Sequence, residues 1–75
     1  MPDATLDARG LTCPMPVLKA RKALMGVKPG GTLRVLATDP GTVRDFAALC
    51  EATGHVLLES GEADGVFSFL IRRAA

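Results

Sequence analysis

The sequence predicts an α/β (α+β) two-layer sandwich with the element order β-α-β-α-β-β. Three observations lead to this fold class: two segments with helical periodicity each follow a strand-like segment, two further β-rich segments end the chain, and glycine or proline lies near most boundaries. Two helices can cover only one face of a four-stranded sheet. We therefore expect a mixed four-stranded sheet with both helices on one face.

The length and composition predict one small folded domain that comprises residues 1–75. Hydrophobic residues make up 48% of the chain and charged residues 23%, which is typical of a globular domain. The N-terminus lacks the basic region and apolar run of a signal peptide, and no segment has the length of a membrane span. We expect a cytoplasmic protein with no membrane partner, and the two cysteines are too few for a secreted disulfide framework.

The first half of the chain predicts a strand, a helix and a second strand. Residues 5–9 alternate apolar and polar side chains, as a short strand does, and residues 32–38 form a second β-rich segment. Between them, residues 14–25 have helical periodicity and end at Gly26. The side chains expected to face the core from this helix are Val17, Ala20 and Leu24.

The second half of the chain predicts another helix and then a hairpin. The helix is expected to follow Asp39–Pro40, where a capping side chain precedes a proline, and to end at Gly54. Its expected apolar stripe consists of Val43, Phe46, Ala47 and Cys50. Residues 55–60 and 66–72 are β-rich, and residues 61–65 are expected to form the hairpin loop between them.

Cys13 is the strongest candidate for chemistry because it directly precedes Pro14 at the predicted start of the first helix. Pro14 suits the first helical position, so we expect Cys13 to be the N-cap residue. The positive end of the helix dipole and the unpaired N–H groups there should lower the pKa of the thiol and favour the reactive thiolate. Pro16 has no N–H to donate, so the sulfur should remain incompletely capped.

The cysteines and the histidine also have other interpretations. Cys13 could instead be a buried packing residue, as free cysteines often are. A redox dithiol is excluded because Pro16 occupies the place of its second cysteine, and no cysteine and histidine spacing indicates a metal site or another cofactor. Cys50 lies on an apolar stripe and should be buried, and the lone His55 should be structural.

Positive charge is concentrated in the part of the chain that contains Cys13. Residues 8–38 carry six basic and no acidic residues, although the net charge of the whole chain is only +1. This asymmetry suggests a partner with negative potential, and the alternative is an ordinary solvated helix face. The residues expected to dock partners are Arg9, Met15, Lys19, Arg21 and Lys22. Pro14, Pro16 and Asp39 should shape the site, since both helices are expected to start at the same edge of the sheet.

Residues 6–17, Leu-Asp-Ala-Arg-Gly-Leu-Thr-Cys-Pro-Met-Pro-Val, resemble the Cys-Pro-x-Pro signature of the TusA/SirA-like sulfur carriers. The resemblance covers nearly the whole chain, and its further positions are Lys22, Gly30, Asp39–Pro40, Asp45–Phe46, Cys50, Gly54–His55 and residues 67–71. It implies a fold like the C-terminal domain of translation initiation factor three. It also implies that Cys13 carries sulfane sulfur as a persulfide.

The resemblance also implies the kinds of partner in this relay. The donor would be a cysteine desulfurase or a rhodanese, and the acceptor would be a TusBCD-like or DsrE-like protein. The sulfur would then serve 2-thiouridine synthesis in tRNA, molybdenum cofactor assembly or sulfur oxidation. On this hypothesis the protein is a carrier that turns over only within a relay, and not an enzyme.

An RNA-binding or regulatory module with a basic surface and a structural Cys13 is the alternative function. The chain has three aromatic residues, all phenylalanine, which are few for stacking on single-stranded nucleic acid. The near-neutral net charge also counts against it. We therefore expect no direct nucleic-acid binding.

Overall fold

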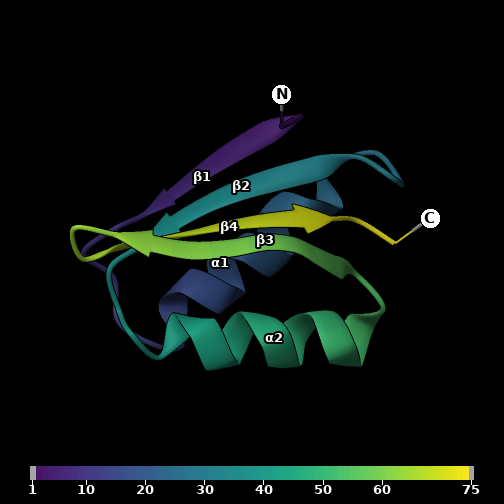
Figure 1. Cartoon of the computed structure of the whole chain (residues 1–75). Helices are drawn as coiled ribbons and strands as arrows, with labels where there is room; N and C mark the ends of the chain where they lie inside the picture. The colour runs from purple at the N-terminus through teal and green to yellow at the C-terminus, as the bar shows by residue number, and fades with distance from the viewer. Residues whose placement is uncertain (1, 75) are drawn as a thin grey trace.

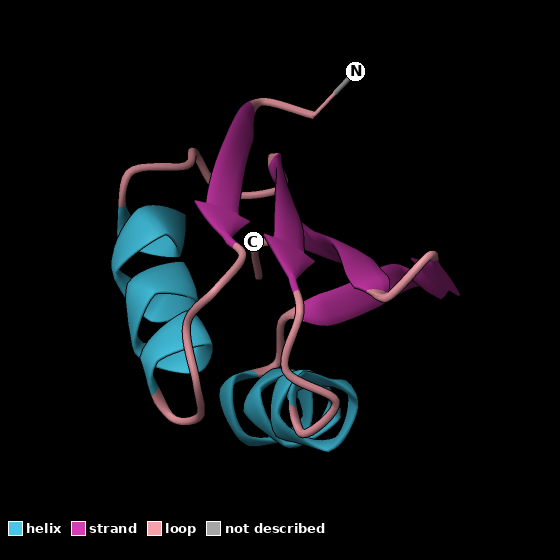
Figure 2. Ribbon diagram, turned by 90° about the vertical axis from the view of Figure 1, so that its left-hand side faces the viewer, coloured by secondary structure: helices cyan, strands magenta, loops and turns pink. Residues whose placement is uncertain are grey.

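Four strands form one mixed sheet, and two helices cover one of its faces. The computed structural model describes residues 2–74. Along the chain the elements are β1 (Ala4–Ala8), α1 (Met15–Met25), β2 (Thr32–Ala37), α2 (Thr42–Thr53), β3 (Val56–Ala63) and β4 (Val66–Arg72) (Figure 1). The strand order is β1-β2-β4-β3, with β1 and β2 parallel and the other two pairs antiparallel. Both helices lie on the same side of the sheet (Figure 2), which confirms the predicted fold class.

The core lies between the sheet and the two helices. Alternate residues of β2 and β4 face the helices and are completely buried, and they are Leu33, Val35, Ala37, Phe69 and Ile71. Helix α1 packs on β1 and β2, whereas α2 packs on β3 and β4. The ring centroids of Phe46 on α2 and Phe69 on β4 are 4.7 Å apart, so this aromatic pair joins the helix layer to the sheet.

The buried side of α2 differs from the predicted apolar stripe. The side chains that α2 buries are Thr42, Phe46, Leu49 and Cys50. Val43 is 44% exposed and Ala47 is exposed, so the prediction was wrong at these two positions. Thr42 can be buried because its hydroxyl donates to the carbonyl oxygen of Asp39 at 2.6 Å. A locally satisfied threonine therefore takes the core position that hydrophobicity alone assigned to valine.

The hairpin between β3 and β4 is tighter than predicted. Residues 61–63 continue β3 and pair with β4, so the expected five-residue loop was too long. The turn consists of Asp64 and Gly65, whose φ angles are 52° and 80°. Two successive positive φ angles fit the right-handed twist of the flanking strands, and Asp-Gly is a preferred sequence for such a turn.

Neither helix in residues 2–74 is long and apolar enough to cross a membrane.

The two helices end at glycines with different backbone conformations, which allows a matched test. Gly54 follows α2 in the left-handed region with φ 83°, and its N–H donates to the carbonyl of Cys50 at 2.9 Å. Gly26 follows α1 in the right-handed region with φ −90°. Within residues 2–74, a Cβ at Gly54 would meet no atom within 4 Å, so its cost would be purely conformational.

We expect Gly54→Ala to lower the free energy of unfolding by about 1–2 kcal/mol, because an L-residue in the left-handed region is strained. Gly26→Ala should change it by less than about 0.5 kcal/mol, since alanine readily adopts the right-handed conformation. Urea unfolding of the two variants measures both values. An equal loss of stability in the two variants would contradict this explanation of the helix ends.

Candidate functional site

Cys13 lies in the connection between β1 and α1, at the centre of a tight turn. The carbonyl of Thr12 accepts a hydrogen bond from the N–H of Met15 at 2.9 Å, and Cys13 and Pro14 are the two residues between them. Helix α1 begins at Met15, and its N-cap residue is Pro14. The prediction that Cys13 is the N-cap residue was therefore wrong by one position. The second proline, Pro16, is buried in the first turn of the helix.

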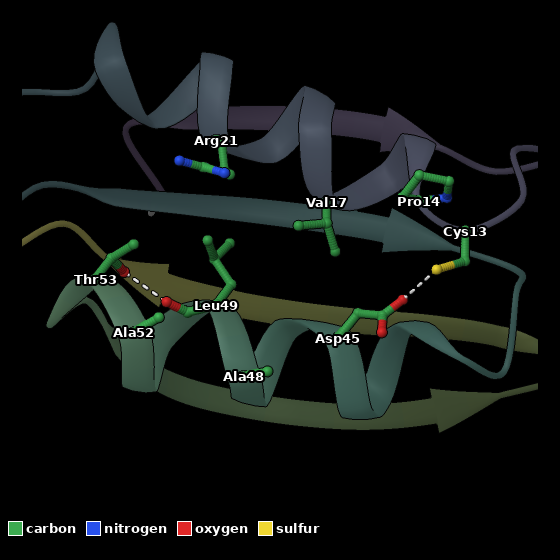
Figure 3. Close-up of a pocket in the computed structure, with 9 residues that line it drawn as sticks. All are labelled: Cys13, Pro14, Val17, Arg21, Asp45, Ala48, Leu49, Ala52 and Thr53. Atoms are coloured by element: carbon green, nitrogen blue, oxygen red, sulfur yellow. Dashed lines mark hydrogen bonds between the residues drawn. The ribbon is translucent and has the colours of Figure 1, made fainter.

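The side chain of Cys13 is exposed, so the alternative of a buried packing cysteine is wrong. Its thiol donates a hydrogen bond to Oδ2 of Asp45, in the first turn of α2, with a sulfur–oxygen distance of 2.8 Å (Figure 3). The sulfur is thus placed between the starts of the two helices. Cys50, in contrast, is 7% exposed and belongs to the core, as predicted.

Asp39 ties the Cys13 turn to the start of α2. Its Oδ2 accepts the backbone N–H of Cys13 at 2.7 Å, and its Oδ1 accepts the N–H of Gly41 at 3.0 Å. These two hydrogen bonds hold the pKa of the Asp39 carboxyl below its usual value. The expected proximity to Cys13 is present because the parallel strands β1 and β2 end at the same edge of the sheet. The N-cap residue of α2 is Gly41, so the prediction that Asp39 caps this helix was wrong.

The surroundings of the Cys13 sulfur are acidic, although the chain around Cys13 is basic. The hydrogen bond to Asp45 raises the pKa of the thiol, and partial desolvation and the negative charges of Asp45 and Asp39 raise it further. The prediction of a lowered pKa was therefore wrong. The count of charged residues along residues 8–38 was correct, but the fold brings two carboxylates from the second half of the chain to the turn that holds Cys13.

Two hollows in the surface meet at Cys13 and Asp45. The first, with a volume of about 480 Å³, is a groove between α1 and α2. It is lined by Val17 and Arg21 on α1 and, farther along α2, by residues such as Ala48 (Figure 3). The second, of about 500 Å³, lies over the start of α2, where its lining includes Pro40, Val43 and Arg44. The thiol is therefore reachable from two sides.

The comparisons with known proteins decide the family. The family model described as Sulfurtransferase TusA matches residues 4–73. This chain belongs to the TusA family. The resemblance to the TusA/SirA-like sulfur carriers is thereby confirmed over residues 4–73.

Members of the TusA family are similar to this chain along nearly their full length. The sulfur carrier protein TusA of Allochromatium vinosum is 50% identical over 72 residues, which cover 96% of this chain and 95% of that protein. The protein of the same name from Pseudomonas putida strain GB-1 is 46% identical over 74 residues, with 99% and 92% covered. The crystal structure of a SirA-like protein from Desulfitobacterium hafniense superposes with a TM-score of 0.83 at 31% identity, covering 96% of this chain and 99% of that one.

The residues predicted to dock partners of this TusA-family protein are exposed, and of these only Arg21 lines one of the two hollows beside the sulfur. Arg21 lines the groove between the helices. Met15 is 42% exposed in the first turn of α1, and Lys19 and Lys22 are exposed on the same helix. Their role in docking stays a prediction.

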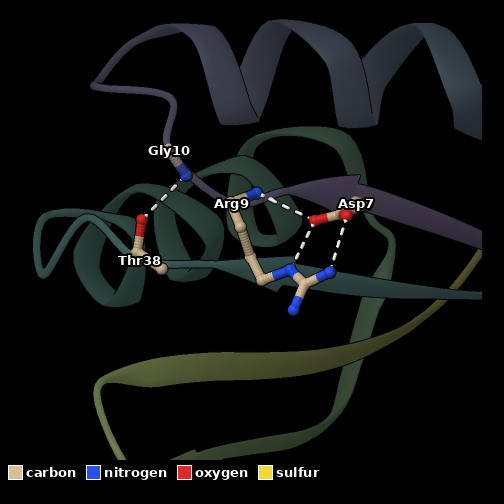
Figure 4. A network of polar contacts seen from close by, with 4 residues as sticks. All are labelled: Asp7, Arg9, Gly10 and Thr38. Carbon is tan, nitrogen blue, oxygen red and sulfur yellow. Dashed lines mark hydrogen bonds and ion pairs between the residues drawn. The ribbon is translucent and has the colours of Figure 1, made fainter.

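Arg9 has a defined structural contact of its own. Its guanidinium donates from Nε and one terminal nitrogen to the two carboxylate oxygens of Asp7, at 2.8 and 2.9 Å (Figure 4). This pair holds the pKa of Asp7 at about 2. The neighbouring N–H of Gly10 donates to the hydroxyl of Thr38 at 2.9 Å. These contacts fix the beginning of the connection that leads to Cys13.

Asp45 and Arg44 are site residues that the sequence reasoning missed. An acidic residue in the first turn of the second helix was the available signal, because both helices were expected to start at one edge of the sheet.

Among residues 2–74, no group of three histidine, cysteine or acidic side chains is arranged to hold a metal ion. His55 accepts the backbone N–H of Ala74 at 2.9 Å through Nδ1, a structural contact.

Proposed function

We propose that this chain is a sulfur carrier that accepts one sulfane sulfur atom on Cys13 as a persulfide and passes it to an acceptor thiol. The observation that carries the proposal is the exposed thiol in the Cys-Pro-x-Pro turn, at the point where two hollows meet. Membership of the TusA family supports it. On this proposal residues 1–75 act as one carrier domain. The test is intact mass spectrometry after incubation with a sulfur donor, since loading adds about 32 Da to the chain.

The proposed chemistry consists of two sulfur transfers, the first from a donor onto Cys13 and the second from Cys13 to an acceptor. The Cys13 thiolate attacks the outer sulfur of a donor persulfide, which forms a bond to Sγ and breaks the S–S bond of the donor. The donor thiolate leaves and takes up a proton. An acceptor thiolate then attacks the outer sulfur on Cys13 and regenerates the original thiol. Each transfer exchanges one S–S bond for another, so neither needs an oxidant or a reductant.

We propose that the chain is a carrier and not an enzyme, because it would turn over only between a donor and an acceptor. A cysteine desulfurase or a rhodanese fits the donor role, and a TusBCD-like or DsrE-like protein fits the acceptor role. The chemistry needs a reduced thiol, which fits the cytoplasm. Direct nucleic-acid binding has little support, because Phe46 and Phe69 are completely buried and the third aromatic residue, Phe67, packs partly buried against the core.

We propose that the exposed side of α1 guides partners to Cys13. This helix presents Lys19 and Lys22 beside the exposed apolar side chains of Met15 and Leu18, and Leu18 is 49% exposed. Such a surface fits a partner with an acidic rim and an apolar centre. The positive charges would act mainly on the rate of encounter, because exposed charges are screened in the final complex.

Lys19→Glu should slow sulfur loading from a cysteine desulfurase by about threefold or more at low ionic strength, because it reverses a charge on the docking surface. Lys28→Glu, an identical charge change beyond the far end of α1, is the matched control and should load as fast as the wild type. The initial rate of appearance of the loaded mass measures the effect. A defect that persists unchanged at high salt, or an equal defect in Lys28→Glu, would argue against docking through this surface.

A further inference from the structure

Two carboxylates hold the Cys13 turn, and they hold different atoms of it. Asp39 accepts the backbone N–H of Cys13 and thereby fixes the loop. Asp45 accepts the proton of the thiol itself, with its Oδ2 at 2.8 Å from Sγ. Asp45 also lines both hollows beside the sulfur. A change at the sulfur atom is therefore transmitted directly to Asp45, whereas the contact of Asp39 with the backbone is independent of it.

We propose that Asp45 is a positioning residue that distinguishes the empty carrier from the loaded one: it holds the unloaded Cys13 as a hydrogen-bonded thiol against α2 and releases the sulfur once a persulfide has formed. This inference rests on the proposed function as a sulfur carrier. It goes beyond the proposed function because it gives Asp45 a role, whereas the proposed function needs only an exposed Cys13 thiol.

The hydrogen bond exists only while the sulfur carries a proton. An ionised carboxylate is an acceptor and cannot donate, so the thiol must supply the hydrogen. The same carboxylate raises the pKa of the thiol, which keeps the empty carrier protonated at neutral pH. A persulfide is more acidic than the thiol from which it forms. Loaded Cys13 is therefore an anion that has no proton to donate and faces a second negative charge, and the two repel each other.

The charged groups around Cys13 show where the released sulfur can go. Asp45 and Arg44 face it from α2, Asp39 from the connection before α2, and Arg21 lines the groove from α1. Each hollow thus has an arginine in its lining and is open to solvent. The persulfide anion turns away from Asp45 into one of these hollows, where it takes up the proton of an acceptor thiol, and the resulting acceptor thiolate attacks the outer sulfur and releases the Cys13 thiolate.

The proton balance of loading is consistent with this arrangement. The donor persulfide, R–S–SH, gives its outer sulfur to Cys13 and leaves as R–S⁻, and the proton from the Cys13 thiol ends on this leaving group as R–SH. The new persulfide on Cys13 then releases its own proton to water at neutral pH. In this exchange the proton passes from the Cys13 thiol to the leaving group, so Asp45 acts only through the position of the sulfur.

The first experiment measures the empty carrier with iodoacetamide as the probe. Alkylation of Cys13 is followed against pH by mass spectrometry of the peptide that contains it, so that Cys50 does not interfere. In Asp45→Asn the negative charge beside the thiol is lost, so Cys13 should react several-fold faster at neutral pH and the midpoint of its pH profile should move to lower pH. Glu51→Gln makes the same charge change elsewhere on α2 and should match the wild type.

The second experiment measures the loaded carrier. Each protein is loaded with sodium polysulfide, freed of excess reagent and treated with cyanide, which removes the outer sulfur as thiocyanate. Asp45→Asn and the wild type should release thiocyanate at rates within about twofold of each other, because the loaded sulfur has left Asp45. Asp45→Ser, which also lacks the charge, should behave like Asp45→Asn in both experiments and covers the case in which one variant folds poorly.

The proposal is overturned if Asp45→Asn alkylates no faster than the wild type, since Asp45 then does not hold the thiol. It is also overturned if the substitution changes cyanide release as much as alkylation, since the sulfur then stays beside residue 45 after loading. If Glu51→Gln had an equal effect, the change in net charge alone would explain the faster alkylation. The hydrogen bond from the thiol to Asp45 would then have no role. Failure of the wild type to take up sulfur from an enzymatic donor would instead reject the proposed function, and the alkylation result would still stand.

Discussion

Cys13→Ser should abolish sulfur loading completely, so that the chain keeps its unmodified mass after incubation with a cysteine desulfurase and cysteine. Serine cannot form a persulfide, and its hydroxyl can still donate to Asp45, so the substitution removes the reactive atom and retains the hydrogen bond that orders the turn. The wild type should gain about 32 Da. Because residue 13 is exposed, the free energy of unfolding should change by no more than about 0.5 kcal/mol.

Cys50→Ala is the matched control for this experiment. It removes the other thiol of the chain, which is 7% exposed in the core and therefore inaccessible to a protein donor. Loading should remain at the level of the wild type, although stability should fall slightly because a small cavity is created. A loaded mass on Cys13→Ser, or its loss in Cys50→Ala, would reject Cys13 as the carrier residue.

The fold was predictable because its strongest signals are local. The helical periodicity of α1, the β-rich segment of β4 and the glycines after both helices each specify one element without reference to the rest of the chain. The errors occur where a tertiary or backbone contact decides. Thr42 replaces Val43 in the core because its hydroxyl bonds to the chain before α2, and hydrophobicity does not report this.

The candidate site was predictable in part, and the missing part concerns its charge. Cys13 is recognisable from its own neighbours, and the parallel pairing of β1 and β2 brings Asp39 beside it. Asp45 is different, because its contact with the sulfur depends on the rotation of α2 about its axis and on the position of α1. A count of charges along residues 8–38 predicts a basic setting, whereas the fold makes the immediate setting acidic. The sign of the pKa shift could therefore not be obtained from the sequence.

The packing of Phe46 connects this site to the stability of the whole domain. Phe46 directly follows Asp45 and is completely buried, with its ring against that of Phe69. We expect Phe46→Ala to lower the free energy of unfolding by about 3–5 kcal/mol, because it removes a large buried side chain and leaves a cavity. Domains of this kind are stable by about 5–15 kcal/mol in total, so the loss is a large fraction. Urea unfolding followed by circular dichroism measures it.

Val43→Ala tests the same helix on the side that the sequence wrongly assigned to the core. Val43 is 44% exposed, so its truncation should cost less than about 1 kcal/mol. If the two substitutions cost the same, the rotation of α2 described above is incorrect. That rotation also aims Asp45 at the thiol, so iodoacetamide should alkylate Cys13 of Phe46→Ala faster than that of the wild type while the variant remains folded. Faster alkylation would show that the packing of Phe46 also fixes the position of Asp45 beside the thiol, whereas an unchanged rate would contradict this link.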